Sequence, residues 1–384
     1  MILNNLRIAL TGQQVNIRIT NGKITQVLPG HIHDKTEPFV LNFDDVIIFP
    51  GLINSHDHLD FNLFPALGYS TYKNYTEWGL HIHKTYKDQI NSILKVPVAL
   101  REEWGIYKNL LCGVTTVINH GKKVKIQTDL ISVFEDIHNI HSVQFEKKWR
   151  FALNNPLKKK LPVVIHNGEG TDESSFKEID QLTSWNLLKR KLIAVHGVAM
   201  NETQVTQFNA LVWCPESNYF LLGKTAPVNR LKKHIPILFG TDSTLTGNWN
   251  IWDHMRLARK TKFLTDPELY DTLTLNAAKA WKLDSGEIAE GKDADLVIAK
   301  AKNGMTGGDA FYGIDPQDIL MVIHKGAISL FDEELLAQLD GIGLEHYSKV
   351  TINGSVKYLK GNLPELMQKI KQFCPEASFP VTQP

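Results

Sequence analysis

VIIFPGLINSHDH (residues 46–58) is an apolar run of strand length that ends in two histidines separated by one residue. Residues i and i+2 of a strand point to the same face, so His56 and His58 direct both imidazoles to one point just beyond the strand. Neutral imidazole is the commonest metal ligand in proteins. Two ligands do not complete a metal site, so further ligands are expected elsewhere in the chain.

The same histidine spacing occurs at two other places, and neither follows an apolar strand. His31 and His33 lie in a polar stretch after Pro29-Gly30, which is typical of a loop. His81 and His83 lie among charged residues, which predicts an exposed helix or a lid. The metal-binding pair is therefore placed at positions 56 and 58 alone.

From residue 46 onward, short apolar runs alternate with amphipathic stretches. Repeated strand–helix units predict a parallel sheet covered by helices. Seven or eight such units over about 230 residues suit a closed (β/α)8 barrel of the TIM type, with a doubly wound sheet as the alternative. The predicted strands are Val46–Ile53, Val114–Ile118, Ser142–Phe145, Val163–Ile165, Leu192–Val195, Ala210–Cys214 and Ile237–Phe239.

Both ends of the chain instead have the pattern of short antiparallel strands. Val15, Ile17 and Ile19 alternate with polar residues, and Asn21-Gly22 and Asn353-Gly354 are favoured hairpin turns. We therefore expect residues 1–45 and 286–384 to form one small β-sandwich domain. The barrel, residues 46–285, would interrupt it.

Composition narrows the class of protein. Lys and Arg number 42 against 41 Asp and Glu, so the net charge of +1 predicts neither a nucleic-acid nor a membrane partner. No apolar run approaches the roughly 18 residues that span a membrane, and no signal peptide is recognised. The chain has three cysteines, Cys112, Cys214 and Cys374, and no two of them form a Cys-x-x-Cys pair. This spacing favours reduced thiols in the cytoplasm.

Further polar residues follow three of the predicted strands. His166 follows Val163–Ile165, His196 follows Leu192–Val195, and Asp242 follows Ile237–Phe239 after the two residues Gly240 and Thr241. The carboxyl ends of parallel barrel strands meet on one face, so these side chains are expected to join His56 and His58. A single strand-end histidine is usually structural, and a single aspartate is usually a helix cap. Their joint occurrence predicts a metal site.

The chain also resembles the amidohydrolase superfamily, in the branch that holds cytosine and guanine deaminases and triazine hydrolases. The resemblance covers nearly the whole chain. Each motif alone is weak, and together they are specific. The motifs are FPGLINSHDH (49–58), GVTTV (113–117), His166-x-x-Glu169, CPESN (214–218), GTDS (240–243), NAAKA (276–280) and GKDADL (291–296).

The resemblance implies an enzyme that hydrolyses a carbon–nitrogen bond, with one divalent ion, zinc first and iron second. His56, His58, His166 and Asp242 would hold the ion, which lowers the pKa of a bound water toward about 7 and so supplies hydroxide. Glu169 would carry protons as a catalytic residue. His196 would hydrogen-bond the water or the oxyanion, and Asp242 would help to deprotonate the water.

The implied reaction is deamination of a small cyclic amidine or heteroaromatic amine, such as a purine, pyrimidine, pterin or triazine. An amidase or an imidazolone-type ring opener on the same scaffold is the alternative. A non-catalytic relative is disfavoured because all four ligands and Glu169 are present. The sequence does not fix the oligomeric state, and it allows a homodimer.

Several positions depart from the pattern or stay open. A two-metal site would need Glu146 or Lys147 as a bridging ligand, although Glu169 fits the one-metal branch. Trp213 stands where many members of this branch have a histidine, which puts a substrate contact there in doubt. The aromatic segment from Phe61 to Trp78 is either a substrate wall or ordinary packing. The sequence gives no role to His138 and His141.

Overall fold

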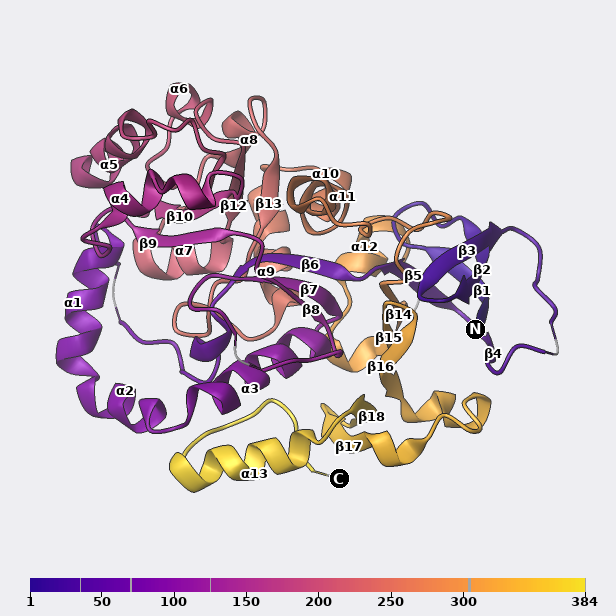
Figure 1. Ribbon diagram of the computed structural model, residues 1–384. Coiled ribbons are helices and arrows are strands. Elements are labelled where there is room, and N and C mark those ends of the chain that lie inside the picture. The colour runs from indigo at the N-terminus through magenta and orange to yellow at the C-terminus, as the bar shows by residue number, and fades with distance from the viewer. Residues whose placement is uncertain (35, 70, 125, 303–304, 384) are drawn as a thin grey trace.

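Two arcs of parallel strands form the centre of the computed structural model, which describes residues 1–34, 36–69, 71–124, 126–302 and 305–383 (Figure 1). The first arc has the order β6-β7-β8 and the second the order β13-β12-β11-β10-β9. The backbone N–H groups of Thr241 and Asp242 donate to the His56 carbonyl at 3.1 and 3.0 Å and join the arcs. The strands are β6 (Leu52–Asp57), β7 (Val114–Asn119), β8 (Ser132–Phe134), β9 (His138–Ser142), β10 (Val163–Asn167), β11 (Leu192–His196), β12 (Ala210–Trp213) and β13 (Ile237–Phe239).

A single cluster of buried side chains lies between the two arcs. It takes residues from β6, β7 and β10 to β13, and α11 (Leu275–Trp281) closes it with Ala277, Ala278 and Trp281. The members from the strands are aliphatic, which keeps polar groups out of this layer: Ile53, Ile118, Val164, Ile193, Val195, Val212 and Leu238. The polar strand-end residues lie beyond it.

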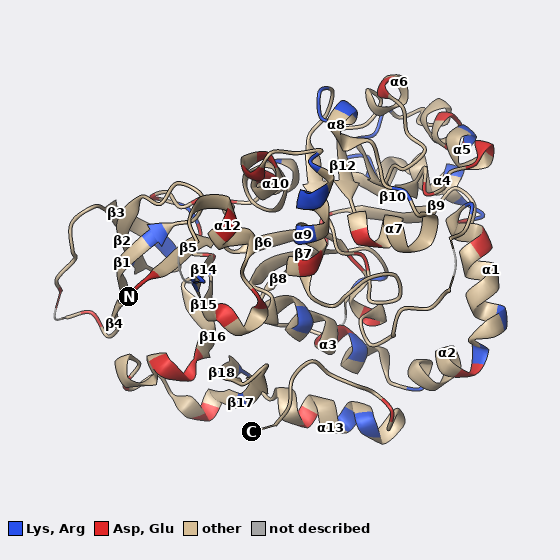
Figure 2. Ribbon diagram, turned by 180° about the vertical axis from the view of Figure 1, so that it is seen from behind, with Lys and Arg blue, Asp and Glu red and all other residues tan. Residues whose placement is uncertain are grey.

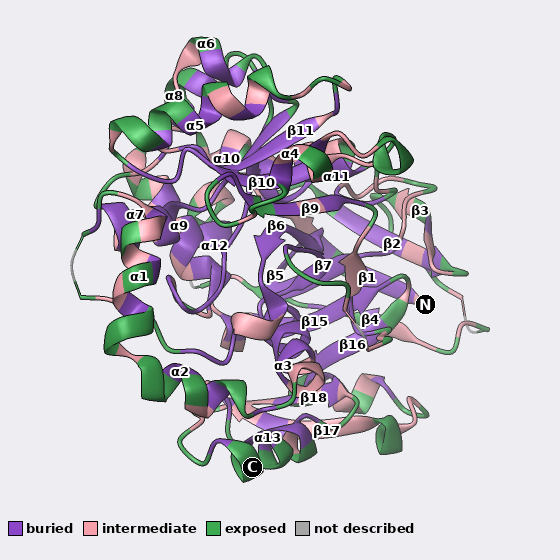
Figure 3. Cartoon of the chain, turned by 60° about the vertical axis from the view of Figure 1, so that its left-hand side comes forward, coloured by how far each residue is buried: buried purple, intermediate pink, exposed green. Residues whose placement is uncertain are grey.

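Helices cover the outside of the arcs, with buried inner faces and exposed outer faces (Figure 3). Side chains at their first turns satisfy backbone N–H groups, as Asn74 does for α1 and Asp172 for α5. The helices are α1 (Tyr75–Thr85), α2 (Lys87–Leu94), α3 (Val98–Leu111), α4 (Trp149–Leu153), α5 (Glu173–Ser184), α6 (Glu202–Val205), α7 (Pro215–Leu222), α8 (Val228–Leu231), α9 (Ile251–Thr261), α10 (Asp266–Leu273), α12 (Gly307–Tyr312) and α13 (Leu363–Phe373).

Both ends of the chain contribute strands to one further sheet, which lies beside the arcs (Figure 1). Its order is β17-β18-β16-β15-β14-β5-β1-β2-β3, and β4 pairs with β1. The strands are β1 (Ile2–Ile8), β2 (Gln14–Thr20), β3 (Lys23–Leu28), β4 (Val40–Asn42), β5 (Val46–Pro50), β14 (Leu296–Lys300), β15 (Ile319–His324), β16 (Ala327–Asp332), β17 (Tyr347–Ile352) and β18 (Ser355–Lys360).

The two expected hairpins are confirmed. Asn21 and Gly22 have φ of 50° and 78° and connect β2 to β3, while Asn353 and Gly354 have φ of 46° and 84° and connect β17 to β18. Positive φ at both central residues is the conformation for which Asn-Gly is selected.

The expected strand Val46–Ile53 is two strands, because the chain passes between sheets at Gly51. β5 pairs with β1 and β14 in the large sheet, whereas β6 pairs with β7. A Cβ at Gly51 would lie 2.2 Å from Thr115 Oγ1, so only glycine permits the crossing. β5, which the expected boundary at residue 46 assigned to the barrel, therefore lies in the large sheet.

The expected strand Ser142–Phe145 is wrong. The strand is β9, His138–Ser142, and residues 143–145 form a turn. Apolar periodicity missed β9 because His138 is one of its buried residues. Arg190 Nη1 satisfies this imidazole at 2.9 Å from Nδ1. His138 is therefore a structural residue.

Charges of both signs are interspersed on helices such as α1 and α13 (Figure 2). Among the described residues, no helix combines the length and the apolar character needed to cross a membrane. Cys112, Cys214 and Cys374 are buried and free.

Candidate active site

Four of the predicted residues meet in a buried cluster at the carboxyl ends of the parallel strands. His56, His166 and His196 lie at or near the ends of β6, β10 and β11, and Asp242 follows β13. None of these residues is more than 6% exposed. His166 Nε2 lies 3.2 Å from His56 Nε2. Two nitrogens bound tetrahedrally to one zinc ion would be about 3.3 Å apart, so these imidazoles fit a shared ion.

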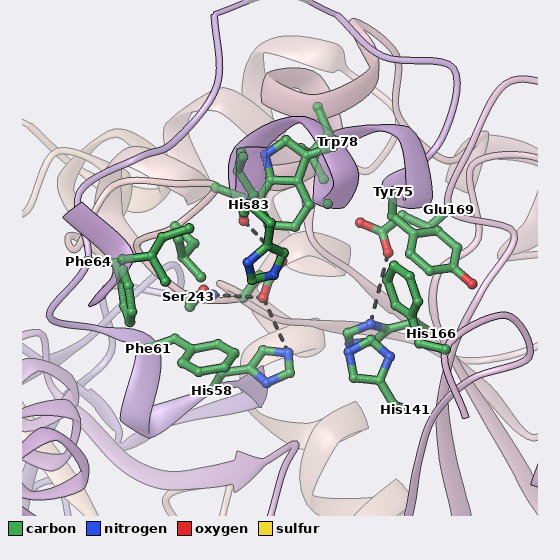
Figure 4. Close-up of a pocket in the computed structure, with 18 of the residues that line it drawn as sticks. His58, Phe61, Phe64, Tyr75, Trp78, His83, His141, His166, Glu169 and Ser243 are labelled. Atoms are coloured by element: carbon green, nitrogen blue, oxygen red, sulfur yellow. Dashed lines mark hydrogen bonds and ion pairs between the residues drawn. The ribbon is translucent and has the colours of Figure 1, made fainter. Parts of the chain in front are cut away.

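His58 approaches the same cluster from the opposite side to His166 (Figure 4). Its Nε2 lies 3.6 Å from Asp242 Oδ1, and His56 Nε2 lies 3.8 Å from the same oxygen. The His58 ring stacks on Phe61, with the two ring centroids 5.6 Å apart, and this contact fixes the plane of the imidazole. The structure therefore brings together all six residues singled out from the sequence, with His196 and Glu169 completing the group.

Two residues of the cluster have strained backbones. His196 has φ of 72° and Asp242 has φ of 57°, in the left-handed region that β-carbon-bearing residues avoid. His196 ends β11 and Asp242 follows β13, and the unusual backbone turns each side chain into the cluster. Strain of this kind costs about 1–3 kcal/mol and concentrates at functional sites.

Asp242 is held in place by hydroxyl groups as well as by histidines. Ser217 and Thr246 donate to its Oδ2 at 2.8 and 3.0 Å, and the Ser243 N–H donates to Oδ1 at 2.8 Å. Burial alone would raise the pKa of Asp242, but the nearby histidines and these hydrogen bonds hold it below its usual value. An ionised carboxylate is the form that binds a cation.

A chain of hydrogen bonds fixes the tautomer of His196. Asn218 Nδ2 donates to Thr225 Oγ1 at 3.1 Å, so its Oδ1 accepts from His196 Nδ1–H at 2.9 Å. His196 Nε2 then carries a lone pair, and it is buried without a hydrogen-bond partner. Trp213 Nε1 also donates to Thr225 at 2.6 Å. Fully buried Trp213 therefore supports this chain through Thr225.

Glu169 lies between two of the histidines. Its Oε2 is 3.6 Å from His196 Nε2 and 4.0 Å from His166 Nδ1. Burial raises its pKa well above the ordinary value, and the charges of Asp242 and Glu178 raise it further. A buried carboxyl group whose pKa lies above its ordinary value, beside an ionised partner, is suited to proton transfer.

The donor set fits a divalent ion of the zinc class. Imidazole and carboxylate ligands from several strands suit zinc or iron. Three sets of residues share members, and within each set the ligand atoms lie within 4.8 Å of one another. The sets are His56, His196 and Asp242; His166, Glu169 and His196; and His56, His120 and His166. His58 belongs to none of these groups, and the neighbouring Asp242 connects it to the cluster.

His120 and His141 are site residues that sequence reasoning missed. His120 follows β7 and stacks on His166, and His141 is in β9 with its centroid 5.0 Å from that of His166. The signal for His120 was present, since an apolar strand precedes a His-Gly pair there as it does at His196-Gly197. Glu146 belongs to none of the ligand groups found among the described residues.

A cavity of about 520 Å³ opens above the cluster. Its floor is polar and includes His58 and His166, with Glu169 beside Tyr75 (Figure 4), and its walls are mostly apolar. Asp242 also lines the cavity. From the aromatic segment, Phe61, Phe64, Tyr75 and Trp78 line it, while Tyr69 is 73% exposed and Tyr72 packs elsewhere in the core. From the helices, the loops and β9 around it come Leu80, Ile82, His83, Ile90, Leu94, His141, Phe145, Leu221 and Leu245.

Comparison with known proteins gives a consistent picture. Residues 150–328 match the model of the Amidohydrolase family. The chain is 24% identical over 395 residues to a 5-methylthioadenosine/S-adenosylhomocysteine deaminase of Caldicellulosiruptor saccharolyticus, covering 84% of this chain and 90% of that one. A Pyrococcus abyssi protein of the same name is 26% identical, but the match spans about half of each chain. An imidazolonepropionase of Thermoplasma volcanium is 24% identical over 83% of this chain and 91% of its own.

Solved structures show the same fold. A zinc-bound adenosine deaminase from Xanthomonas campestris has a TM-score of 0.70 at 17% identity, covering 98% of this chain and 99% of that one. A zinc complex of atrazine chlorohydrolase from Arthrobacter aurescens also has a TM-score of 0.70, at 16% identity, covering 97% and 100% of the two chains.

Proposed function

We propose, from the match of residues 150–328 to the Amidohydrolase family, that this chain is a metal-dependent hydrolase that deaminates a heteroaromatic amine bearing an apolar substituent. The enzyme acts on carbon–nitrogen bonds, as the deaminases among its relatives do. The observation that carries the proposal is the convergence of His56, His166 and Asp242 beside the protonatable Glu169.

We propose one divalent ion, zinc in the first place, held by His56, His58, His166 and Asp242. The zinc-bound structures of the same fold and the donor set support this choice. When bound, such an ion lowers the pKa of a water molecule and polarises the reacting centre.

The protein side chains then move the protons. Glu169 takes one proton from the attacking water and gives it to a ring nitrogen. A second proton passes to the exocyclic amine, which leaves as ammonia while the ring carbon keeps the oxygen of water. His196 Nε2 accepts a hydrogen bond from the water, in keeping with the tautomer that Asn218 fixes. Asp242 assists in removing the first proton.

The walls of the cavity indicate the substituent. Phe61, Trp78, Ile82 and Phe145 surround the space above the polar floor. Burying an apolar group there gains roughly 25 cal/mol for each square ångström removed from water. The hydroxyl groups of a ribose would lose hydrogen bonds to water against the same walls. A purine, pyrimidine, pterin or triazine amine with an alkyl, aryl or thioether group fits both parts of the cavity.

We also propose that the two arcs are one (β/α)8 barrel. The shared aliphatic cluster and the hydrogen bonds from Thr241 and Asp242 to His56 support closure. The large sheet, built from both chain ends, would form the second unit. The three buried free cysteines support a reducing compartment such as the cytoplasm. A homodimer stays a prediction.

The test is ammonia release from a panel in which one ring carries different groups. Adenine, 9-ethyladenine, adenosine and 5′-methylthioadenosine form one series, and diaminotriazines with and without alkyl groups form another. We expect kcat/KM to be higher for substrates that carry an apolar group and lower for substrates that carry an unmodified ribose. Equal values across each series would contradict the assignment of the walls.

One second activity has support, because an imidazolonepropionase matches most of the chain. Opening of an imidazolone-type ring consumes water without releasing ammonia. The same panel, extended with cyclic amides and followed by ultraviolet absorbance, separates the two reactions. Loss of ring absorbance without ammonia would favour ring opening.

A further inference from the structure

His120 has an environment that neither the deaminase mechanism nor the packing accounts for. Its side chain is 2% exposed, and both of its ring nitrogens are buried without a hydrogen-bond partner. Leaving a buried polar atom unsatisfied is costly, and native structures contain few such atoms. His138, by comparison, is also buried, but Arg190 satisfies it. The described residues of the protein therefore supply no hydrogen-bond partner to either ring nitrogen of His120.

The surroundings of His120 show what that partner is. Its ring stacks on His166, with centroids 4.5 Å apart and planes at 21°, and its centroid lies 5.1 Å from that of His56. Ligand atoms of His56, His120 and His166 all lie within 4.8 Å of one another. Two nitrogens on one ion can be about 4.2 Å apart at most, so a shift of at most roughly 0.6 Å brings the His120 nitrogen within that separation of the other two.

The backbone holds His120 at this place. β7 pairs with β6, Asp57 opposite Asn119, and the His120 N–H donates to the Asp57 carbonyl at 2.8 Å. His120 is thus tied to the segment that carries His56 and His58. The position is the carboxyl end of a barrel strand, as for the other candidate ligands.

We propose that His120 is an additional ligand of the metal ion, which would then be held by four histidines and Asp242. The proposal rests on the metal site of the proposed function and adds to it. With one water, the ion would be six-coordinate, a geometry that suits iron(II) or cobalt(II) better than zinc, which prefers four ligands. His120 would therefore let the site hold iron(II) or cobalt(II) as well as zinc.

The decisive variant is His120→Phe, which keeps a ring that can stack on His166 but removes both nitrogens. His120→Ala is the second variant, and His141→Ala is the matched control, because His141 also lies beside His166 but its Nδ1 lies 3.2 Å from Ser142 Oγ. Each purified protein is stripped with a chelator and refilled with cobalt(II) alone. Visible absorption, the cobalt dissociation constant by chelator competition and the melting temperature of the metal-free protein are measured.

We expect His120→Phe to keep or raise the melting temperature of the metal-free protein, because two unsatisfied nitrogens disappear. Its cobalt affinity should fall at least ~10-fold, and its visible bands should shift and intensify as the coordination number drops. His141→Ala should keep the wild-type spectrum. A wild-type spectrum and affinity in His120→Phe would overturn the proposal and leave His120 a packing residue.

The outcomes also separate this inference from the proposed function. Wild-type protein that binds cobalt with the expected dependence on His120, yet releases ammonia from no amine, would remove the deaminase assignment and retain His120 as a ligand. Wild-type protein that binds no cobalt would remove both.

Discussion

Lys108 Nζ lies 3.0 Å from Asp57 Oδ2, and both side chains are almost completely buried. Asp57 is the residue between His56 and His58, and its carboxylate points away from them. Asn109 and Asn54 donate to the same oxygen at 2.8 and 3.3 Å. This buried pair fixes the end of β6, so it orients both histidines without touching the reacting atoms.

We predict that Lys108→Met lowers the free energy of unfolding by about 3–5 kcal/mol, because it leaves the Asp57 carboxylate buried without its cation. Urea unfolding of metal-free protein measures the loss. The double variant Lys108→Met/Asp57→Asn should recover part of it, since no charge remains. A loss below about 1 kcal/mol in the single variant would show that the asparagines alone hold Asp57.

Removing a ligand should empty the metal site. His166→Ala deletes one of the two imidazoles that face each other at 3.2 Å, so metal content should fall from about one ion per chain to nearly none. His83→Ala is the control, because His83 lines the cavity away from the ligand groups. Elemental analysis of both purified variants measures the metal content per chain. Metal retained fully in His166→Ala would place the ion elsewhere.

The apolar wall should affect substrate binding more than chemistry. Phe145 lines the cavity, and because it is half exposed its loss should cost little stability. Phe145→Ala should raise KM for the alkyl-substituted amine by roughly 5–10-fold, with kcat nearly unchanged. Phe151→Ala removes an exposed phenylalanine outside the cavity and should change neither constant. Equal effects of the two variants would argue against Phe145 as a substrate contact.

Glu178 should give a defined pH dependence of stability. Burial raises its pKa from 4.5 to about 7, and the Gly168 N–H donates to its Oε1 at 2.8 Å. Because the pKa of Glu178 is higher in the folded protein than in the unfolded chain, its protonated form contributes its full stabilisation below pH 4.5. This stabilisation is lost as the pH rises toward 7. Wild type should therefore lose up to about 3 kcal/mol relative to Glu178→Gln between these pH values.

Urea unfolding at several pH values checks this, and Glu173→Gln, at an exposed position, is the control. A difference between wild type and Glu178→Gln that does not change with pH would show that Glu178 titrates normally.

The sequence pointed to residues that the fold brings close together, because most of them lie at the end of a continuous apolar strand; their roles stay predictions. His56, His166 and His196 end strands whose residues are all buried, so the transition from apolar to polar was visible. β9 was missed because its buried positions include a histidine that Arg190 satisfies, and that contact lies far along the chain. The crossing at Gly51 depends on the closeness of Thr115, which strand periodicity does not encode.

His120 also shows that strand patterns do not encode contacts between distant segments of the chain. The pattern that identified His196 was also present after Val114–Asn119, but its meaning depends on stacking with His166 across two non-adjacent strands. The left-handed backbones of His196 and Asp242 are also set by tertiary contacts. Local sequence therefore located the donors, and only the packing of the strands shows their geometry.

Glu169 is the proposed proton carrier at the proposed metal site. Glu169→Gln keeps the shape and removes the transferable proton, so turnover of the best amine should fall ~10²–10⁴-fold while metal content stays at the wild-type level. KM should change less than kcat, because the amide still hydrogen-bonds a ring nitrogen. Ammonia release and metal content are measured on the same preparations, with Glu173→Gln as the control. A large fall in turnover with full metal is the predicted result; wild-type turnover with full metal would contradict the account.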